Sequence, residues 1–280
     1  MAAENGRQRG RTTVRIAANG VTLAVEEAGS GVPLLLVHGF PLSAQMWEPV
    51  LPALVAAARV ITLDLRGFGG SQAPPAGYTM EALAEDVVAV ADALGLERFV
   101  LGGHSMGGYV AFRVAARWPQ RLAGLVVVDS RAEADDEAGR QRRQQAIERI
   151  LGGERAGFLE EFLPNLLAPA TRQRAPRLLA ELRRIADEVP AHVLAGCLAG
   201  MRDRPDSRPL LPGLGVPALV LVGAEDAITP PDTARAMAEA LPRGRLAVIP
   251  GCGHTPPVER PVAVAEALLD FLRAHWAGHA

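Results

Sequence analysis

Lysine is missing from this sequence of 280 residues, so all 29 of its basic residues are arginine. Without lysine, the chain can form neither a lysine Schiff base with a substrate nor the lysine contact that P-loop proteins make with a nucleotide phosphate. Both mechanisms are excluded before any motif is considered.

Cysteine and long apolar runs are scarce as well. The two cysteines, Cys197 and Cys252, are too few and too far apart to indicate a disulfide framework, so we expect both to be small buried side chains. No stretch approaches the ~20 apolar residues of a membrane span, and no apolar segment follows the basic N-terminus as it would in a signal peptide. We therefore expect a cytoplasmic protein that makes no use of a membrane and that begins with a disordered tail, residues 1–13.

The chain carries little net charge. Its formal net charge is −2 and its isoelectric point is about 6.3, which gives no electrostatic reason to expect a nucleic-acid partner. Hydrophobic residues make up 49% of the sequence, which argues against disorder. A chain of this length can bury a sizeable core in one large domain or two smaller ones, and its oligomeric state stays open.

Short apolar runs alternate with helical stretches along most of the chain. Asn19-Gly20 separates two strand-like runs and predicts an antiparallel hairpin. The later strand-like runs are 33–37, 60–65, 98–102, 122–128, 218–222 and 246–249, and the helical stretches are 80–94, 108–117, 232–241 and 262–276. Such alternation predicts an α/β fold, in which a mostly parallel sheet carries helices on both faces.

Residues 131–206 interrupt this alternation. The segment has no strand-like run, is rich in Arg, Glu, Ala and Leu, and is punctuated by proline, which predicts about four short helices. A loop of this length would be unusual without structure of its own. We expect a helical cap that is inserted between two parts of one core, residues 14–130 and 207–280.

Ser105 lies in the sequence Gly103-His-Ser-Met-Gly107, which has the pattern of a nucleophile elbow. In such an elbow a strand ends, the backbone turns sharply, and a helix begins with a serine hydroxyl exposed at the turn. Glycines two residues before and after the serine avoid collisions with the neighbouring strand and helix. The pattern makes Ser105 a candidate covalent nucleophile.

A serine nucleophile needs a base, and the base needs an acid that orients it. Of the six histidines, His254 is the candidate base, because it follows the last predicted strand in a glycine-rich loop. The other five adjoin the serine, belong to a different motif, or lie in the cap or at the C-terminal end. Asp226, after the strand 218–222, is favoured as the acid over its neighbour Glu225, and Asp129 after the strand 122–128 is the rival.

The reaction also needs two backbone donors for the oxyanion of a tetrahedral intermediate. One is expected at Met106, directly after the nucleophile, and the second at Phe40 in the loop that follows the strand 33–37. His38, in the same loop, is expected to support the loop by hydrogen bonding.

These residues together resemble the α/β-hydrolase superfamily. The matching segments are HGFP (38–41), DLRGFGGS (64–71), GHSMGG (103–108), GAEDAITP (223–230) and GCGHTPPVERP (251–261). Within the superfamily the chain is most similar to small capped bacterial carboxylesterases and 3-oxoadipate enol-lactonases. Haloalkane dehalogenases and epoxide hydrolases of this fold use Asp as nucleophile, whereas this chain has Ser105.

The resemblance implies an eight-stranded, mostly parallel sheet whose second strand is reversed, with the cap inserted after the sixth strand. It implies neither a metal nor an organic cofactor, and the sequence shows no metal-ligand spacing. It also implies structural roles for Asp64, Arg66 and Gly67, as a buried ion pair or a turn, and for Glu259 as support for the loop of His254.

The function expected from these features is hydrolysis of a small ester or lactone through an acyl-enzyme intermediate. C–C bond hydrolysis, cofactor-free perhydrolysis or halogenation, and a receptor without catalysis are the alternatives. Phe40, Met106, Arg131 and Phe162 are expected to line the substrate pocket, and Arg131 either meets a substrate carboxylate or anchors the cap. Further apolar cap residues either cover this pocket or pack within the cap: Leu159, Leu163, Leu166, Leu167, Val193 and Leu194.

Overall fold

The computed structural model describes residues 6–8 and 11–276, and within these residues nine strands form one sheet in the order β1-β2-β3-β5-β4-β6-β7-β8-β9. The strands are β1 (Gly6–Gln8), β2 (Arg11–Ala18), β3 (Val21–Ala28), β4 (Pro33–Val37), β5 (Arg59–Leu63), β6 (Phe99–His104), β7 (Leu122–Val128), β8 (Ala218–Gly223) and β9 (Gly244–Ile249). β3 pairs antiparallel with both β2 and β5, whereas β5, β4, β6, β7, β8 and β9 pair in parallel. The eight-stranded, mostly parallel sheet with a reversed second strand is confirmed in β2–β9, and β1 extends its edge.

The expected tail of residues 1–13 is wrong for the part that the structure describes. Residues 6–8 form β1, which pairs antiparallel with the start of β2 at residues 11–13. Backbone N–H and C=O groups make these hydrogen bonds. Strand pairing therefore extends to residues that precede Val14, where the apolar pattern begins. Residues 1–5 and 9–10 of that expectation lie outside the described residues, as do residues 277–280 at the end of the expected core.

The central strands are buried because their sequences are apolar on both faces. Leu34, Leu35, Leu36 and Val37 of β4 are fully buried, as a strand covered by helices on both sides requires. At the β2–β3 hairpin, residues 19 and 20 have φ values of 48° and 76°, which an Asn-Gly pair adopts readily.

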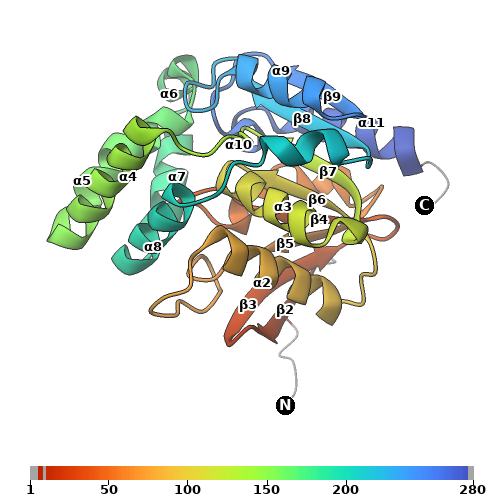
Figure 1. The fold of residues 1–280 in the computed structure, drawn as a ribbon, viewed down its shortest axis with the longest axis horizontal. Helices are drawn as coiled ribbons and strands as arrows, with labels where there is room; N and C mark the ends of the chain where they lie inside the picture. The colour runs from red at the N-terminus through yellow and green to blue at the C-terminus, as the bar shows by residue number, and fades with distance from the viewer. Residues whose placement is uncertain (1–5, 9–10, 277–280) are drawn as a thin grey trace.

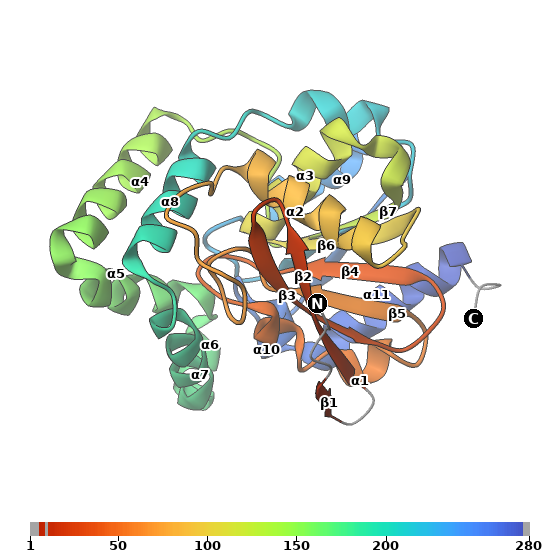
Figure 2. The ribbon, with the colours of Figure 1, turned by 90° about the horizontal axis from the view of Figure 1, so that it is seen from below.

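Helices cover both faces of the sheet. Figure 2 shows α2 and α3 on one side of the sheet and α1 and α11 on the other, and each of these pairs is in contact. The helices outside the insertion are α1 (Leu51–Leu54), α2 (Met80–Ala93), α3 (Met106–Arg117), α9 (Pro231–Ala240), α10 (Pro256–Glu259) and α11 (Pro261–Trp276). The Thr79 side chain begins α2 by accepting a hydrogen bond from Ala82 N at 3.1 Å.

Residues 131–206, which we call the helical insertion, separate β7 from β8. They contain α4 (Glu137–Arg149), α5 (Arg155–Phe162), α6 (Pro169–Arg174), α7 (Pro176–Asp187) and α8 (Ala191–Arg202), one helix more than the pattern predicts, and no strand. In Figure 1 these helices, coloured green to teal, lie together at one side of the sheet. Within residues 6–8 and 11–276, none of the helices combines the length and the apolar character that a membrane crossing requires.

The strand order creates a switch point at β4. The chain passes from β4 to β5 on one side and later to β6 on the other side, so the connections after β4 and β6 diverge. Open α/β sheets bind their ligands at such a switch point, outside the carboxyl ends of the strands. The loops that carry Phe40 and Ser105 begin at the carboxyl ends of β4 and β6.

Candidate active site

Ser105 stands at the turn between β6 and α3, with φ 50° and ψ −111°. A non-glycine residue rarely adopts this conformation, and such strain gathers at functional sites. The turn is tight on both sides: a Cβ on Gly103 would lie 2.2 Å from Gly107 O, and a Cβ on Gly107 would lie 2.5 Å from Val37 O. The two glycines therefore permit the close approach that the elbow requires.

The serine, the histidine and the favoured aspartate form one chain of hydrogen bonds. The Ser105 hydroxyl donates to His254 Nε2 at 2.9 Å, and His254 Nδ1–H donates to Asp226 Oδ2 at 2.8 Å. His254 follows β9, and Asp226 follows β8, so both loops leave the carboxyl ends of neighbouring parallel strands. His254 and Asp226 are buried, whereas Ser105 is partly exposed.

Asp226 is held in its ionised form by its hydrogen-bond donors. Its Oδ1 accepts from the N–H groups of Ile228 and Thr229 at 2.8 and 3.0 Å, and its Oδ2 also accepts from Thr229 Oγ1 at 2.6 Å. Burial opposes the charge, but the electrostatic interaction and hydrogen bond with His254 and the hydrogen bond from the Thr229 hydroxyl outweigh it, so the pKa of Asp226 lies well below its usual value. Thr229, which the sequence analysis did not single out, thus belongs to the site.

Asp129, the rival acid, is close to this chain but makes no hydrogen bond to His254. Its Oδ1 accepts from Gly223 N at 2.9 Å, and its buried Oδ2 has no partner among the described residues. Burial and the neighbouring Asp226 charge raise its pKa well above the usual value, which favours its protonated form. A neutral carboxyl group cannot stabilise an imidazolium as an anion does.

Donor atoms of Asp129, Asp226 and His254 lie within 4.8 Å of one another, a set that could hold a metal ion. Both oxygens of Asp226 and both ring nitrogens of His254 already form hydrogen bonds within the protein. A metal ion would have to break the bond between His254 and Asp226, so these residues suit proton transfer better than metal binding.

Two backbone N–H groups near Ser105 are free to bind an oxyanion. Met106 is the first residue of α3, so its N–H has no carbonyl partner within the helix. Among the described residues, neither this group nor Phe40 N–H donates to a loop or a side chain. His38 supports the loop of Phe40, because its Nε2 accepts from Leu65 N at 3.1 Å and its Nδ1–H donates to Gly39 O at 3.0 Å.

His104 and Glu259 position the loop of His254. His104 Nε2–H donates to the backbone oxygen of His254 at 2.6 Å, and burial together with the neighbouring His254 lowers the pKa of His104 to about 3. Glu259 accepts from Gly253 N at 2.8 Å and from Ala168 N at 3.0 Å, which ties the loop to the helical insertion. The contact of Glu259 agrees with its expected structural role; that of His104 was not foreseen, because nothing in its own sequence neighbourhood points to residue 254.

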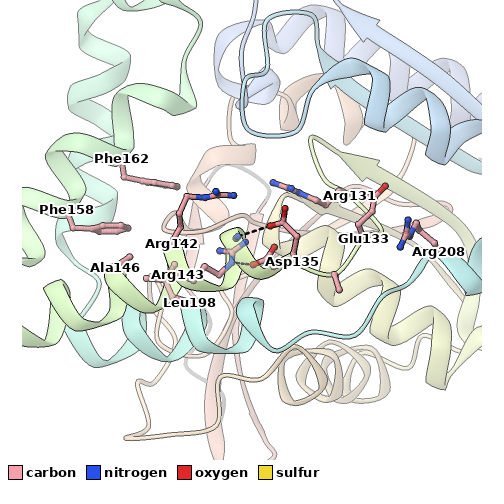
Figure 3. A pocket seen from close by; sticks show the side chains of 13 residues that line it. Arg131, Glu133, Asp135, Arg142, Arg143, Ala146, Phe158, Phe162, Leu198 and Arg208 are labelled. Atoms are coloured by element: carbon pink, nitrogen blue, oxygen red, sulfur yellow. Dashed lines mark hydrogen bonds and ion pairs between the residues drawn. The ribbon is translucent and has the colours of Figure 1, made fainter.

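A cavity of about 750 Å³ is lined by residues of the helical insertion, from Arg131 to Leu198, together with Arg208. Figure 3 shows Arg131, Arg142, Phe158 and Phe162 among the side chains that line it. Phe40 and Met106 do not line this cavity, contrary to expectation, but the Phe40 ring contacts the Phe162 ring at a centroid distance of 5.7 Å. The other expected cap residues are buried in packing and do not line the cavity either: Leu159, Leu163, Leu166, Leu167, Val193 and Leu194.

Comparison with known proteins links this arrangement to a large family. A model of the α/β hydrolase fold matches residues 32–261. The dihydrolipoyllysine-residue acetyltransferase component of an acetoin cleaving system from Pseudomonas putida is 35% identical over 250 residues, which are 88% of this chain but only 64% of that protein. A pimeloyl-(acyl-carrier protein) methyl ester esterase from Aeromonas hydrophila is 31% identical over 261 residues, which cover 90% of this chain and 100% of the esterase.

Solved structures share the fold over nearly their whole length. A thermophilic esterase from Thermogutta terrifontis, solved with bound malate, is 42% identical with a TM-score of 0.90, covering 94% of this chain and 99% of that one. An enol-lactonase from Burkholderia xenovorans is 27% identical (TM-score 0.86; 92% and 99% covered), and a bromoperoxidase from Bacillus anthracis is 28% identical (TM-score 0.82; 90% and 96% covered). With its sheet, its elbow and these relatives, the chain belongs to the α/β hydrolase fold family.

Proposed function

We propose that this hydrolase cleaves small carboxylic esters or lactones through an acyl-enzyme intermediate on Ser105. The observation that carries the proposal is the unbroken hydrogen-bond chain from Ser105 Oγ through His254 to Asp226, with distances of 2.9 and 2.8 Å. Ser105 needs such a base, because a serine hydroxyl is a weak nucleophile at neutral pH.

In the first half of the reaction Ser105 Oγ attacks the carbonyl carbon of the ester and transfers its proton to His254 Nε2. The N–H groups of Phe40 and Met106 bind the resulting oxyanion. Asp226, ionised and hydrogen-bonded to Nδ1, stabilises the imidazolium and keeps its ring oriented. His254 then donates the proton to the alcohol oxygen as the C–O bond breaks, which leaves an acyl group on Ser105.

In the second half, water replaces the alcohol. His254 takes a proton from the water as its oxygen attacks the acyl carbon, and it returns that proton to Ser105 Oγ when the acid departs. The helical insertion acts as a cap in this scheme, because Phe158 and Phe162 cover the cavity beside the oxyanion loop of Phe40. The partner is a small molecule, and the reaction requires no cofactor.

Two similarities to solved structures support an ester or lactone bond as the one that is cleaved. The thermophilic esterase shares 42% of its residues with the chain, and the enol-lactonase shares the fold at a TM-score of 0.86. The similarity to a bromoperoxidase supports a second candidate, in which hydrogen peroxide replaces water and releases a peracid from the same acyl-enzyme.

The experiment that tests the proposal is an activity panel of 4-nitrophenyl esters of increasing chain length and a set of lactones. We expect hydrolysis by the wild-type protein, none by Ser105→Ala, and no effect of a chelator. Peroxide-dependent bromination is measured in parallel at equal enzyme concentration. A bromination rate far above every hydrolysis rate would favour the second candidate, and equal activity of the wild type and Ser105→Ala would overturn both.

A further inference from the structure

Arginine and acidic side chains meet in the cavity of the helical insertion, and three of them, Asp135, Arg143 and Arg208, form ion pairs. Arg143 pairs with Asp135, and Arg208 pairs with Asp206. Asp135 also accepts from Arg204, at 2.8 Å. These groups neutralise one another, so they offer little attraction to a charged ligand.

Two arginines of the cavity lack a carboxylate partner. Arg131 donates from Nη2 to the backbone oxygen of Ile228 at 3.0 Å, and its buried Nε has no partner among the described residues. Arg142, on α4, forms neither a hydrogen bond nor an ion pair with any residue that the structure describes. Figure 3 shows the two guanidinium groups directed toward one another from opposite sides of the cavity.

We infer that Arg131 and Arg142 together bind a carboxylate group of the substrate, so that the enzyme prefers esters or lactones that carry a second, ionised acid group. This inference rests on the proposed ester hydrolysis for its substrate. Guanidinium groups suit the task, because each presents several N–H donors in a plane that matches the two oxygens of a carboxylate.

Hydrogen bonds of neighbouring residues connect Arg131 to the loops of Ser105 and Asp226. Arg131 follows Ser130, whose hydroxyl donates to the backbone oxygen of Ser105 at 2.8 Å. The carbonyl that holds Arg131 belongs to Ile228, whose N–H donates to Asp226. Ser105, Ser130 and Ile228 do not line the cavity, so Arg131 is the residue that connects it to the loops of the candidate triad.

The aromatic side of the cavity favours an apolar segment in the substrate. Phe158 and Phe162 stack at a centroid distance of 5.5 Å, and both contact the ring of Phe40. A substrate that spans the cavity therefore meets apolar rings near the oxyanion loop and positive charge toward Arg131 and Arg142. A short apolar chain between the ester and the carboxylate fits both surfaces.

One acidic side chain remains unpaired in the cavity. Glu133 Oε2 is buried without a partner among the described residues, and Figure 3 shows its carboxylate on the side of Arg131 that faces Arg208, away from Arg142. A ligand between Arg131 and Arg142 thus has the two guanidinium groups nearest to it.

The first test compares esters that differ only in charge. 4-Nitrophenyl hydrogen glutarate and its neutral methyl ester share the acyl chain and the leaving group, and 4-carboxyphenyl acetate with its methyl ester places the charge on the alcohol side. At constant ionic strength we expect a higher kcat/KM for the anionic member of at least one pair. Arg131→Gln should lower that preference about 10- to 100-fold, and the more exposed Arg142→Gln about 3- to 10-fold.

Arg177→Gln is the matched control, because Arg177 is an exposed arginine of α7 in the same insertion that does not line the cavity. It removes the same charge and should leave the preference unchanged. Equal kcat/KM values within both ester pairs, or a loss of preference as large in Arg177→Gln as in Arg131→Gln, would overturn the inference.

Binding of glutarate, measured by calorimetry, separates this inference from the proposed function. If the wild type binds glutarate and Arg131→Gln does not, while no ester is cleaved, the result supports the anion site and contradicts the proposed ester hydrolysis. If esters are cleaved but glutarate binds equally to wild type, Arg131→Gln and Arg142→Gln, the result supports ester hydrolysis and contradicts carboxylate binding by the two arginines.

Discussion

Ser105 Oγ and His254 Nε2 lie 2.9 Å apart, although 149 residues separate them in the chain. Each side chain projects from a loop at the carboxyl end of a sheet strand, and the helical insertion lies between them in sequence without displacing either loop. The sheet thus sets the distance between the proposed nucleophile and the proposed base.

Because the two residues act as one unit, their substitutions should not be additive. Ser105→Ala and His254→Ala should each lower kcat for ester hydrolysis by a factor on the order of 10⁴–10⁶, and the double variant should be no slower than the slower single variant. Steady-state kinetics with a 4-nitrophenyl ester measure this. A double variant that loses the product of the two single factors would show that Ser105 and His254 act independently.

Asp226 and Asp129 can be distinguished by replacing each carboxylate with an amide. Asp226→Asn should lower kcat by about 10⁴-fold, because the amide no longer stabilises the imidazolium or selects its tautomer. Asp129→Asn should change kcat less than tenfold, because Asp129 makes no hydrogen bond to His254 and its raised pKa favours the neutral form that an amide resembles. The reverse order of the two effects would assign the acid to Asp129.

The raised pKa of Asp129 predicts a pH dependence of stability with an unusual sign. Its folded pKa lies above its unfolded value of about 3.9, so above that pH the unfolded chain releases a proton that the folded protein keeps. The free energy of unfolding therefore falls as pH rises, by up to ~1.4 kcal/mol per pH unit, until the folded pKa is reached.

The comparison is between wild type and Asp129→Asn, which carries no proton to lose. In urea unfolding from pH 4 to pH 8, the variant should gain stability relative to wild type as pH rises. A constant difference across this range would mean that Asp129 is ionised in the folded protein.

Arg66 and Asp86 form a buried ion pair whose two hydrogen bonds are both 2.6 Å long. Asp86 is fully buried and also accepts from Asn19 of the β2–β3 turn at 3.1 Å. Asp86→Ala should lower the free energy of unfolding by about 3–5 kcal/mol, because it leaves the charge of Arg66 buried without a partner. Urea denaturation gives the value.

The neighbouring pair supplies the control for Asp86. Glu85 pairs with Arg117 on the surface, with both side chains more than 40% exposed, so Glu85→Ala should cost no more than about 1 kcal/mol. The double variant Arg66→Met/Asp86→Leu should be more stable than Asp86→Ala, because it removes both charges. Equal costs for Asp86→Ala and Glu85→Ala would contradict a buried pair.

Sequence motifs were sufficient for the parts of the site that depend on local geometry. The elbow at Ser105 follows from Gly103 and Gly107, since only glycine permits the backbone contacts at that turn. The positions of Ser105, Asp226 and His254 along the chain were predicted because each follows an apolar run that ends in a loop. The structure brings these three side chains together. In contrast, residues 6–8 have no apolar pattern, so their backbone pairing in β1 left no signal.

The amino-acid sequence by itself determined the hairpin, the parallel sheet and the residues that can perform acyl transfer, because hydrophobic periodicity and short-range sterics act within a few residues. Only the tertiary structure decided that Asp226 rather than Asp129 contacts His254, that His104 holds the backbone of residue 254, and that Arg131 and Arg142 stand without carboxylate partners. Those facts depend on burial and on charges brought together from distant segments, and neither quantity is defined before the chain is folded.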